Sequence, residues 1–169
     1  MPGKYTVHGV LSDLDLFRRL RARGQSRGAE GIDDLVAALH LVSGEPFTEL
    51  RDNGWSWLLE GERLDHIMTS AIVDVGHIVT AHALAVGDLD LAELAARTAL
   101  GASPYDEVAQ LDMVEVRRAR GDESGAAEHL REDILNRSDD GLGPIELPER
   151  TSRIVHDKDW VPPRTRRTG

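Results

Sequence analysis

Apolar residues recur at helical spacing along most of this chain, as expected for helices that each bury one face. The longest such pattern covers residues 58–86 and predicts the longest helix. Its apolar positions are Leu64, Ile67, Met68, Ala71, Ile72, Val75, Ile78, Val79 and Val86. Gly76 lies within this pattern, where glycine costs about 1 kcal/mol relative to alanine. We therefore expect a neighbouring helix to pack closely against Gly76.

Two shorter helices are predicted before the long one. Ser12 and Asp15 form a capping-box pattern at the start of the first helix, and Gly24 is a natural stop for it. The second helix is predicted over 31–43, because the glycine and proline that follow it cannot continue a helix. Residues 45–57 are then expected to form a loop.

Two Gly-Asp pairs occur at a regular interval in the second half of the chain. Gly87 precedes Asp88 and Gly121 precedes Asp122, so the interval is 121 − 87 = 34 residues. In each pair the glycine is expected to end one helix and the aspartate to cap the next. Paired helices repeating at about this interval have the tetratricopeptide period. The interval therefore predicts helical hairpins, which stack because none can bury its apolar face alone.

The helices of this repeat are expected over 89–100, 104–120 and 123–137. Ser103 and Pro104 predict the start of the middle helix, since serine is a good N-cap and proline suits the first helical position. The small residues expected to let neighbouring helix axes approach closely are Ala92, Ala95 and Ala99.

The composition agrees with a helical fold. Hydrophobic residues make up 40% of the chain and aromatic residues only 4%, which suits helices better than sheets. We predict an all-α fold of tetratricopeptide-like stacked helical hairpins. The expected organisation is an irregular lead-in over 1–11, the helical domain over 12–138, and a mostly irregular C-terminal segment and tail over 139–169.

Charge and cysteine content narrow the function. The net charge is −10, from 20 basic and 30 acidic residues, which opposes binding to a polyanion such as DNA. The absence of cysteine excludes disulfides, thiol catalysis and cysteine-based zinc sites. With no long uninterrupted apolar run and no signal-peptide core, we expect no membrane insertion by this segment. The expected location is the cytoplasm, or the soluble part of a larger membrane-associated protein.

Enzyme motifs receive little support. Residues 24–28 have the spacing of a nucleophile elbow around Ser26, but that motif requires a preceding strand, and here a helix is predicted. We interpret the segment as a turn between helices. Nucleotide-binding fingerprints are absent from the sequence. We therefore expect a protein without catalytic residues or a cofactor.

A metal site on the long helix is the other chemical possibility. The candidate ligands are Glu62, Asp65, His66, Asp74, His77 and His82. A metal site within a helical bundle needs matching ligands on a facing helix, and the sequence offers no clear second set. Solvated charges and partly buried histidines are the preferred interpretation. An all-α metal-binding enzyme is the less favoured alternative.

Two groups of residues are candidates for contact with a partner protein. The first is the arginine-rich first helix, and the second is a pair of tryptophans in the predicted loop. These candidates are Arg18, Arg19, Arg21, Arg23, Trp55 and Trp57. The arginines form either a solvated face or a contact with an acidic partner or DNA, and the net charge favours the solvated face. The tryptophans either form a binding hot spot or, as we prefer, fill the core.

Several stretches resemble the bacterial transcriptional activator domain, a tetratricopeptide-like domain of actinobacterial antibiotic-pathway regulators that also occurs in related LysM-linked proteins. The similar stretches are 38–47, 57–64, 87–100 and 103–107. The resemblance implies a helical regulatory and interaction module of a transcriptional regulator. In those regulators a winged-helix domain precedes this one. Only about eleven residues precede the first predicted helix here, so DNA binding is not carried over.

Overall fold

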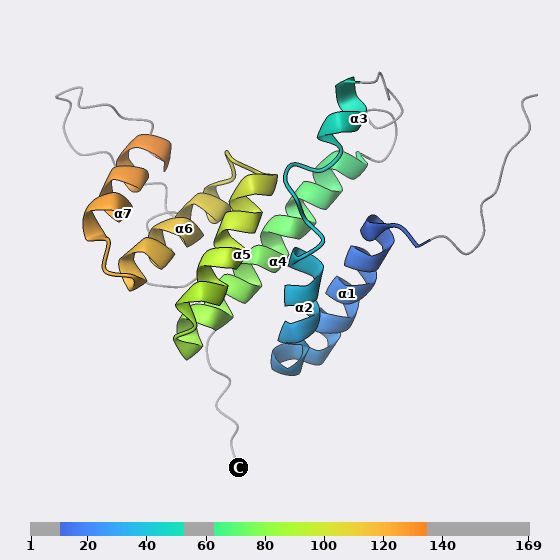
Figure 1. Ribbon diagram of the computed structural model, residues 1–169, viewed down its shortest axis with the longest axis horizontal. Helices are drawn as coiled ribbons and strands as arrows, with labels where there is room; N and C mark the ends of the chain where they lie inside the picture. Colours follow the sequence, from blue (N-terminus) through green and yellow to red (C-terminus); the bar gives the residue numbers. More distant parts are fainter. Residues whose placement is uncertain (1–10, 53–62, 135–169) are drawn as a thin grey trace, which may run out of the picture.

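The computed structural model of the protein describes residues 11–52 and 63–134. Every regular element in these two ranges is a helix, which confirms the predicted all-α class (Figure 1). The elements are α1 (Asp13–Arg27), the 3-10 turn η1 (Gly28–Gly31), α2 (Ile32–Leu39), α3 (Thr48–Asp52), α4 (Leu64–Val86), α5 (Leu89–Ala102), α6 (Glu107–Ala119), α7 (Glu123–His129) and the π-helical turn η3 (Leu130–Ile134). Expectations for residues 1–10 and 135–169 lie outside the described residues.

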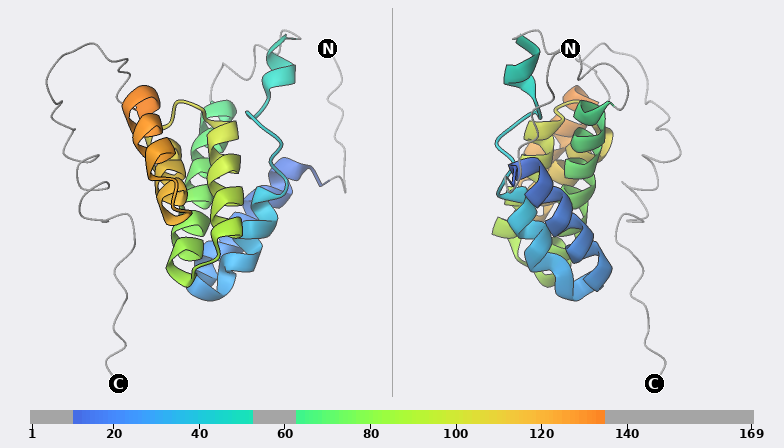
Figure 2. Two further views of the ribbon diagram at one scale, coloured as in Figure 1. Left: turned by 60° about the vertical axis from the view of Figure 1, so that its left-hand side comes forward. Right: turned by 90° about the vertical axis from the view of Figure 1, so that its right-hand side faces the viewer.

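The long helix α4 lies at the centre of the fold. It forms a hairpin with α5, and α2 packs against it together with α1. α6 contacts both α4 and α5, and α7 packs on α6. α7 and α1 therefore lie at opposite ends of the described fold (Figures 1 and 2).

Three apolar clusters hold the described helices together. The largest joins α1, α2 and α4 to α5 through residues such as Phe17 and Leu35. The second joins α4 and α5 to α6 through small residues of α5 together with Met113 and Val116. The third joins the same three helices around Ala99. All three clusters include residues of the α4–α5 hairpin, which is therefore the shared centre of the packing.

The α4–α5 contact depends on small residues. A Cβ atom added to Gly76 would lie 2.6 Å from the Cβ of Ala99 and 3.2 Å from the carbonyl oxygen of Ala95. Ala92, Ala95 and Ala99 are completely buried. The close approach predicted at Gly76 and along the alanines of α5 is thus confirmed.

The two Gly-Asp turns are equivalent in detail. Gly87 and Gly121 both adopt left-handed backbone conformations, with φ of 83° and 84°. In each turn the aspartate N–H bonds a carbonyl five residues earlier, Ala83 in the first and Arg117 in the second. Each aspartate carboxylate then accepts from the N–H three residues later, in α5 and α7. The predicted caps are therefore confirmed, and they recur at the predicted interval.

The predicted end of the first helix was wrong. α1 begins after Ser12 as expected, but it passes through Gly24 and ends at Arg27. Gly24 is needed for a helix contact and not for a stop, because a Cβ atom there would lie 2.6 Å from a methyl carbon of Leu35. Ser26 therefore lies in the last turn of a helix, where its hydroxyl donates to the carbonyl of Arg23, without the strand that a nucleophile elbow requires.

Other predicted boundaries also shift. α2 ends at Leu39 and not at residue 43, because the N–H groups of Leu41 and Val42 bond carbonyls only three residues back. The predicted loop contains the short helix α3. α4 begins at Leu64, later than the pattern predicts, and residues 53–62 are outside the described residues.

The start of α6 is a further correction. The predicted N-cap was Ser103, but α6 begins at Glu107 with Asp106 as its cap. The Asp106 carboxylate accepts from the N–H groups of Val108 and Ala109 at 2.9 and 3.2 Å. Ser103 instead follows the end of α5, donating its N–H to the carbonyl of Ala99. The carboxylate satisfies two free N–H groups of the first turn, which explains why it takes the capping position.

By length and composition alone, α4 is long and apolar enough to cross a membrane. Within the fold, 56% of its most apolar window is buried. The central helix of a packed domain is apolar on most sides for the same reason. Its hydropathy is therefore accounted for by contacts with α2, α5 and α6.

Thr80 offers a test of packing on α4. Its side chain is completely buried, and its hydroxyl oxygen has no hydrogen-bond partner within the described residues. Valine has nearly the same shape but no polar group to desolvate. We expect Thr80→Val to stabilise the protein by about 1 kcal/mol, measured by urea unfolding. A loss of stability would show that the hydroxyl is satisfied in solution.

Candidate interaction groove

A cavity lies between α5 and α7, with residues of α6 at its base. It is open to solvent and has a volume of about 780 Å³. α5 contributes Glu93, Arg97, Leu100 and Gly101, α6 contributes Met113, Val116, Arg117 and Arg120, and α7 with its preceding turn contributes Asp122, Gly125 and Glu128. We call this cavity the α5–α7 groove.

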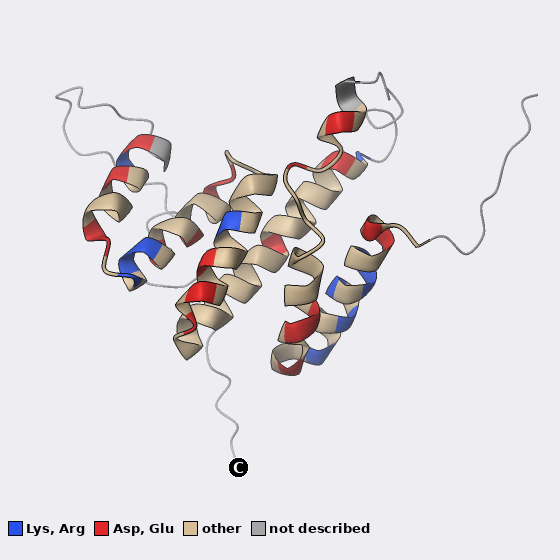
Figure 3. Ribbon diagram, in the orientation of Figure 1, with Lys and Arg blue, Asp and Glu red and all other residues tan. Residues whose placement is uncertain are grey.

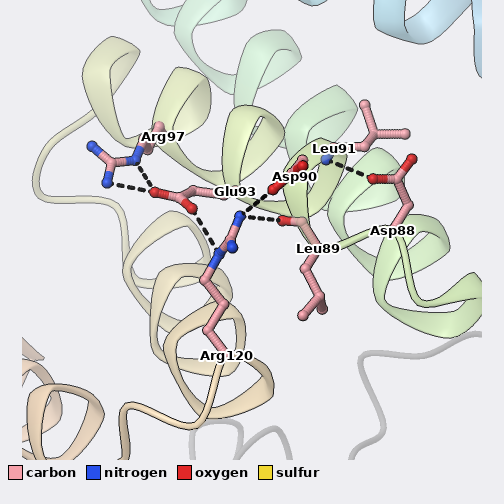
Figure 4. A network of polar contacts seen from close by, with 7 residues as sticks. All are labelled: Asp88, Leu89, Asp90, Leu91, Glu93, Arg97 and Arg120. Atoms are coloured by element: carbon pink, nitrogen blue, oxygen red, sulfur yellow. Dashed lines mark hydrogen bonds and ion pairs between the residues drawn. The ribbon is translucent and has the colours of Figure 1, made fainter.

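An ion-pair network connects two walls of the groove, α5 and α6. The Arg120 guanidinium contacts the carboxylates of Asp90 and Glu93, each at 2.7 Å, and the carbonyl oxygen of Leu89 at 3.2 Å (Figure 4). Because α5 and α6 run in opposite directions, the pairing of Arg120 with Glu93 places Arg97 opposite Val116, one turn further along. The same register places Leu100 opposite Met113.

The floor of the groove is apolar. Val116 is 1% exposed and Met113 is 6% exposed, and Leu100 is half-buried beside them. Gly101 lies on α5 at the same level, where an added Cβ atom would meet nothing within 4 Å. The groove therefore has room for a side chain above a hydrophobic base.

The charges on the walls are unevenly matched. Arg97 and Arg120 share one carboxylate, that of Glu93 (Figure 4). Hydrogen bonding to Asp90 is the main reason that the pKa of Arg120 is raised. Arg117 donates to the carbonyl oxygen of Gly125 at 2.9 Å, and no carboxylate pairs with it among the described residues. Figure 3 shows the basic residues gathered at the end of α6 nearest α7.

A second cavity lies between α1 and α4, beside the connection from α2 to α3. It has a volume of about 340 Å³ and is lined mainly by apolar residues such as Leu14, Phe17 and Phe47. The α5–α7 groove is larger, at about 780 Å³, and its walls carry charged side chains from three helices, so it is the better candidate site.

The arginines predicted as partner-binding do not all have the same surroundings. Arg18 and Arg19 are exposed on α1 and make no ion pair within the described residues. Arg21 contacts Asp74 of α4 at 3.1 Å, and Arg23 contacts Asp34 of α2 at 2.7 Å. Two of the four candidates therefore connect helices of the fold. The other predicted partner-binding residues, Trp55 and Trp57, lie outside the described residues.

The candidate metal ligands on the long helix contact different neighbours. Asp74 points toward α1, whereas the Nδ1 atom of His77 lies 2.9 Å from the carboxylate of Asp112 on α6. Near the start of α4, Arg63 contacts both Asp65 and His66. Within the described residues, no group of three or more potential ligands is arranged to hold a metal ion. Glu62 is outside these residues.

Asp112 is a buried charged residue that the sequence analysis did not single out. Burial raises the pKa of its carboxyl group, and the hydrogen bond to His77 opposes that shift. The pair joins α4 to α6 across 35 residues of sequence. The sequence did contain a sign of this buried charge, because Asp112 is an acidic residue between Leu111 and Met113 on the apolar face of a predicted helix. We assign the pair a positioning role, since it fixes α6 against the α4–α5 hairpin.

The contact between Asp34 and Arg23 leads to a prediction about acid stability. Asp34 is 7% exposed and also lies 3.4 Å from Arg27. Its pKa is lowered, chiefly by the hydrogen bond from Arg23. A lowered pKa stabilises the fold above the usual aspartate value of about 4, and this contribution is lost as the pH falls through the folded-state value.

We therefore expect Asp34→Asn to lower the urea midpoint at neutral pH. The difference from wild type should shrink as the pH falls below about 4. The matched control is Asp33→Asn, which changes an exposed neighbour in the same helical turn. A difference that stays constant down to strongly acidic pH would contradict this role of Asp34.

Comparisons with known proteins do not assign the chain to a family. No protein-family model, curated protein or solved structure matches the chain.

Proposed function

We propose that the chain is a non-catalytic protein-interaction domain of a regulatory protein, and that its helices from α4 onward are stacked hairpins of the tetratricopeptide type. Two equivalent Gly-Asp turns 34 residues apart support this arrangement. The packing of α6 against both helices of the preceding hairpin supports it as well. On this proposal a partner protein docks in the α5–α7 groove.

The observation that carries the proposal is the combination of an apolar floor with charged walls in an open groove. Leu100 is half-buried and supplies accessible apolar surface above the buried Met113 and Val116, while Arg97 and Glu128 lie at the exposed rim. This is the usual anatomy of a protein interface, with a hydrophobic centre and a polar edge. No bond chemistry is needed for docking by shape and charge.

The resemblance to the bacterial transcriptional activator domain gives this proposal its regulatory context. We place the domain in a cytoplasmic transcriptional-regulator-type protein, where it transmits a signal by holding a partner. Direct DNA contact through α1 is less well supported. Of Arg18, Arg19, Arg21 and Arg23, the first two make no ion pair with any described residue. Two such charges on an acidic protein neutralise few phosphates.

The test uses affinity capture with the full chain and a groove-blocking variant. Gly101→Phe places an aromatic ring in the open space of the groove and should leave the fold intact, because no atom lies near that position. We expect a protein retained by wild type to be lost with Gly101→Phe and kept with the double variant Arg18→Gln, Arg19→Gln. Equal retention by wild type and Gly101→Phe would contradict the proposal.

A further inference from the structure

The contact between α4 and α6 contains a polar pair, His77 and Asp112, in apolar surroundings. On α4, Val73 lies one turn before His77. On α6, Ala109 lies one turn before Asp112, and Val116 lies one turn after it. Val73 and Ala109 share one apolar cluster, and Val116 belongs to another. The pair is therefore placed between apolar contacts that hold α6 on the α4–α5 hairpin.

The two members of the pair differ in their access to water. The side chain of His77 is 28% exposed, whereas that of Asp112 is 4% exposed. The Nδ1 atom of His77 lies 2.9 and 3.1 Å from the two carboxylate oxygens of Asp112. A proton from solvent can therefore reach the imidazole, while burial removes most of the water that would solvate the carboxylate.

The charges on α6 favour a proton on the pair. Burial raises the pKa of the Asp112 carboxyl group, and the hydrogen bond to His77 opposes that shift. The negative charges of Asp106 and Glu115 raise the pKa of Asp112 further. The same carboxylates attract a positive charge on the imidazole.

The other helices around the pair present few charges to it. On α4, Asp74 lies one turn before His77, and it contacts Arg21 of α1. α5 packs against this contact with completely buried alanines. α7 places His129 against α6, where it bonds the side chain of Gln110. His129 is thus a second titratable group whose effect has to be separated from that of His77.

We propose that the His77–Asp112 pair is a pH-sensitive contact that holds the α6–α7 hairpin on α4 most firmly at mildly acidic pH. With one proton bound, the pair consists of an imidazolium and a carboxylate, which attract each other strongly away from water. Loss of this proton leaves a buried carboxylate beside a neutral ring. The inference goes beyond the interaction function proposed above and does not depend on it.

The direction of the pH dependence follows from proton binding. A histidine in an unfolded chain loses its proton near about pH 6.5. In the folded protein the adjacent carboxylate favours the protonated ring, so the folded state keeps the proton to higher pH. The state that binds more protons is stabilised as the pH falls. The contribution of the pair is therefore present below about pH 6.5 and is lost as the pH rises above it.

The first test is an NMR titration of the histidines in the full chain. The signals of His77 and His82 are followed from about pH 5 to about pH 9. His82 is half-buried on the same helix and serves as the internal reference. We expect His77 to titrate at a higher pH than His82, and Asp112→Asn to lower the midpoint of His77. A His77 midpoint at or below that of His82, or one unchanged by Asp112→Asn, would overturn the inference.

Urea unfolding measures the effect of the pair on stability. Between about pH 5.5 and about pH 7.5, the folding equilibrium constant of the wild type should fall at least about fivefold relative to that of His77→Gln. Glutamine keeps an N–H donor but does not titrate. His82→Gln is the matched control and should keep the wild-type pH dependence. His129 is unchanged in all of these proteins, so its titration cancels. Parallel pH profiles for the wild type and His77→Gln would contradict the proposal.

Amide hydrogen exchange locates the effect within the fold. In the wild type, protection in α6 and α7 should fall with rising pH relative to protection in α1 and α2. His77→Gln should remove this difference. An equal fall in all four helices would show that the pair stabilises the whole fold, and it would overturn the assignment to the α6–α7 hairpin.

Discussion

Gly76→Leu is expected to destabilise the protein by about 3 kcal/mol, with a fall in Tm of roughly 10 °C. Even a single added carbon at Gly76 would lie 2.6 Å from the Cβ of Ala99. The side chains on both helices are already minimal at this crossing, so α4 and α5 can accommodate a leucine only by moving apart. Because all three apolar clusters include residues of this hairpin, the separation would loosen each of them.

The matched control for this change is Gly101→Ala. Gly101 also lies within a helix, α5, but an added Cβ atom there meets no atom within 4 Å. Alanine is the better helix former, so this variant should gain up to about 1 kcal/mol. Gly76→Ala, in contrast, should lose stability despite the same gain in helix propensity. If both alanine variants were stabilising, α4 and α5 would not be as close in solution as the structure places them.

Leu35→Ala is expected to cost about 3 kcal/mol, within the usual range for removing a fully buried leucine. Leu35 is 1% exposed and packs in the cluster that joins α1 and α2 to α4. It also lies against Gly24, where α1 and α2 approach each other closely. No neighbouring side chain can therefore move into the space that the leucine leaves. A cavity would therefore remain, and unfolding by urea would report the loss.

The control for Leu35 is Leu94→Ala on α5. Leu94 is 37% exposed, so its truncation leaves no closed cavity and should cost less than about 1 kcal/mol. A comparable loss at both positions would indicate that α1 and α2 are held less firmly against α4 than the burial of Leu35 implies.

Sequence patterns were most informative where a residue type has one physical use. Gly87 and Gly121 end helices in left-handed conformations that side chains disfavour, and the aspartates that follow them are strong caps. Their positions and roles were therefore predictable. Gly76 was predictable too, because a glycine within an apolar helix is costly unless another helix needs the space.

Predictions failed where two uses of a residue compete. Gly24 looked like a helix stop, yet it allows close contact with Leu35. Ser103 and Asp106 are both good caps, and only the tertiary path of the loop decides that α6 begins after Asp106. Local sequence does not contain that information, because the turn is positioned by the packing of α5 and α6.

The candidate groove was not predicted from the sequence. Arg97, Arg117 and Arg120 come from two helices, and no local pattern shows that they face one cavity. The sequence instead emphasised arginines in α1, where consecutive positions make the cluster visible. The register of α5 against α6, in which Arg120 pairs with Glu93, was needed to bring the groove residues together. Surface sites built from several helices are generally harder to recognise than caps or cores.

The most direct test of the interaction function is site-specific photo-crosslinking in living cells of the source organism. A photoreactive phenylalanine analogue is placed at position 128 on the exposed rim of the groove or, as a reference, at position 18 on α1, without otherwise changing the chain. The proposed function predicts a discrete crosslinked protein from position 128, absent from position 18 and suppressed by the groove-blocking change Gly101→Phe. Crosslinks from position 18 alone, or no crosslink from position 128, would contradict the groove as the site of partner binding.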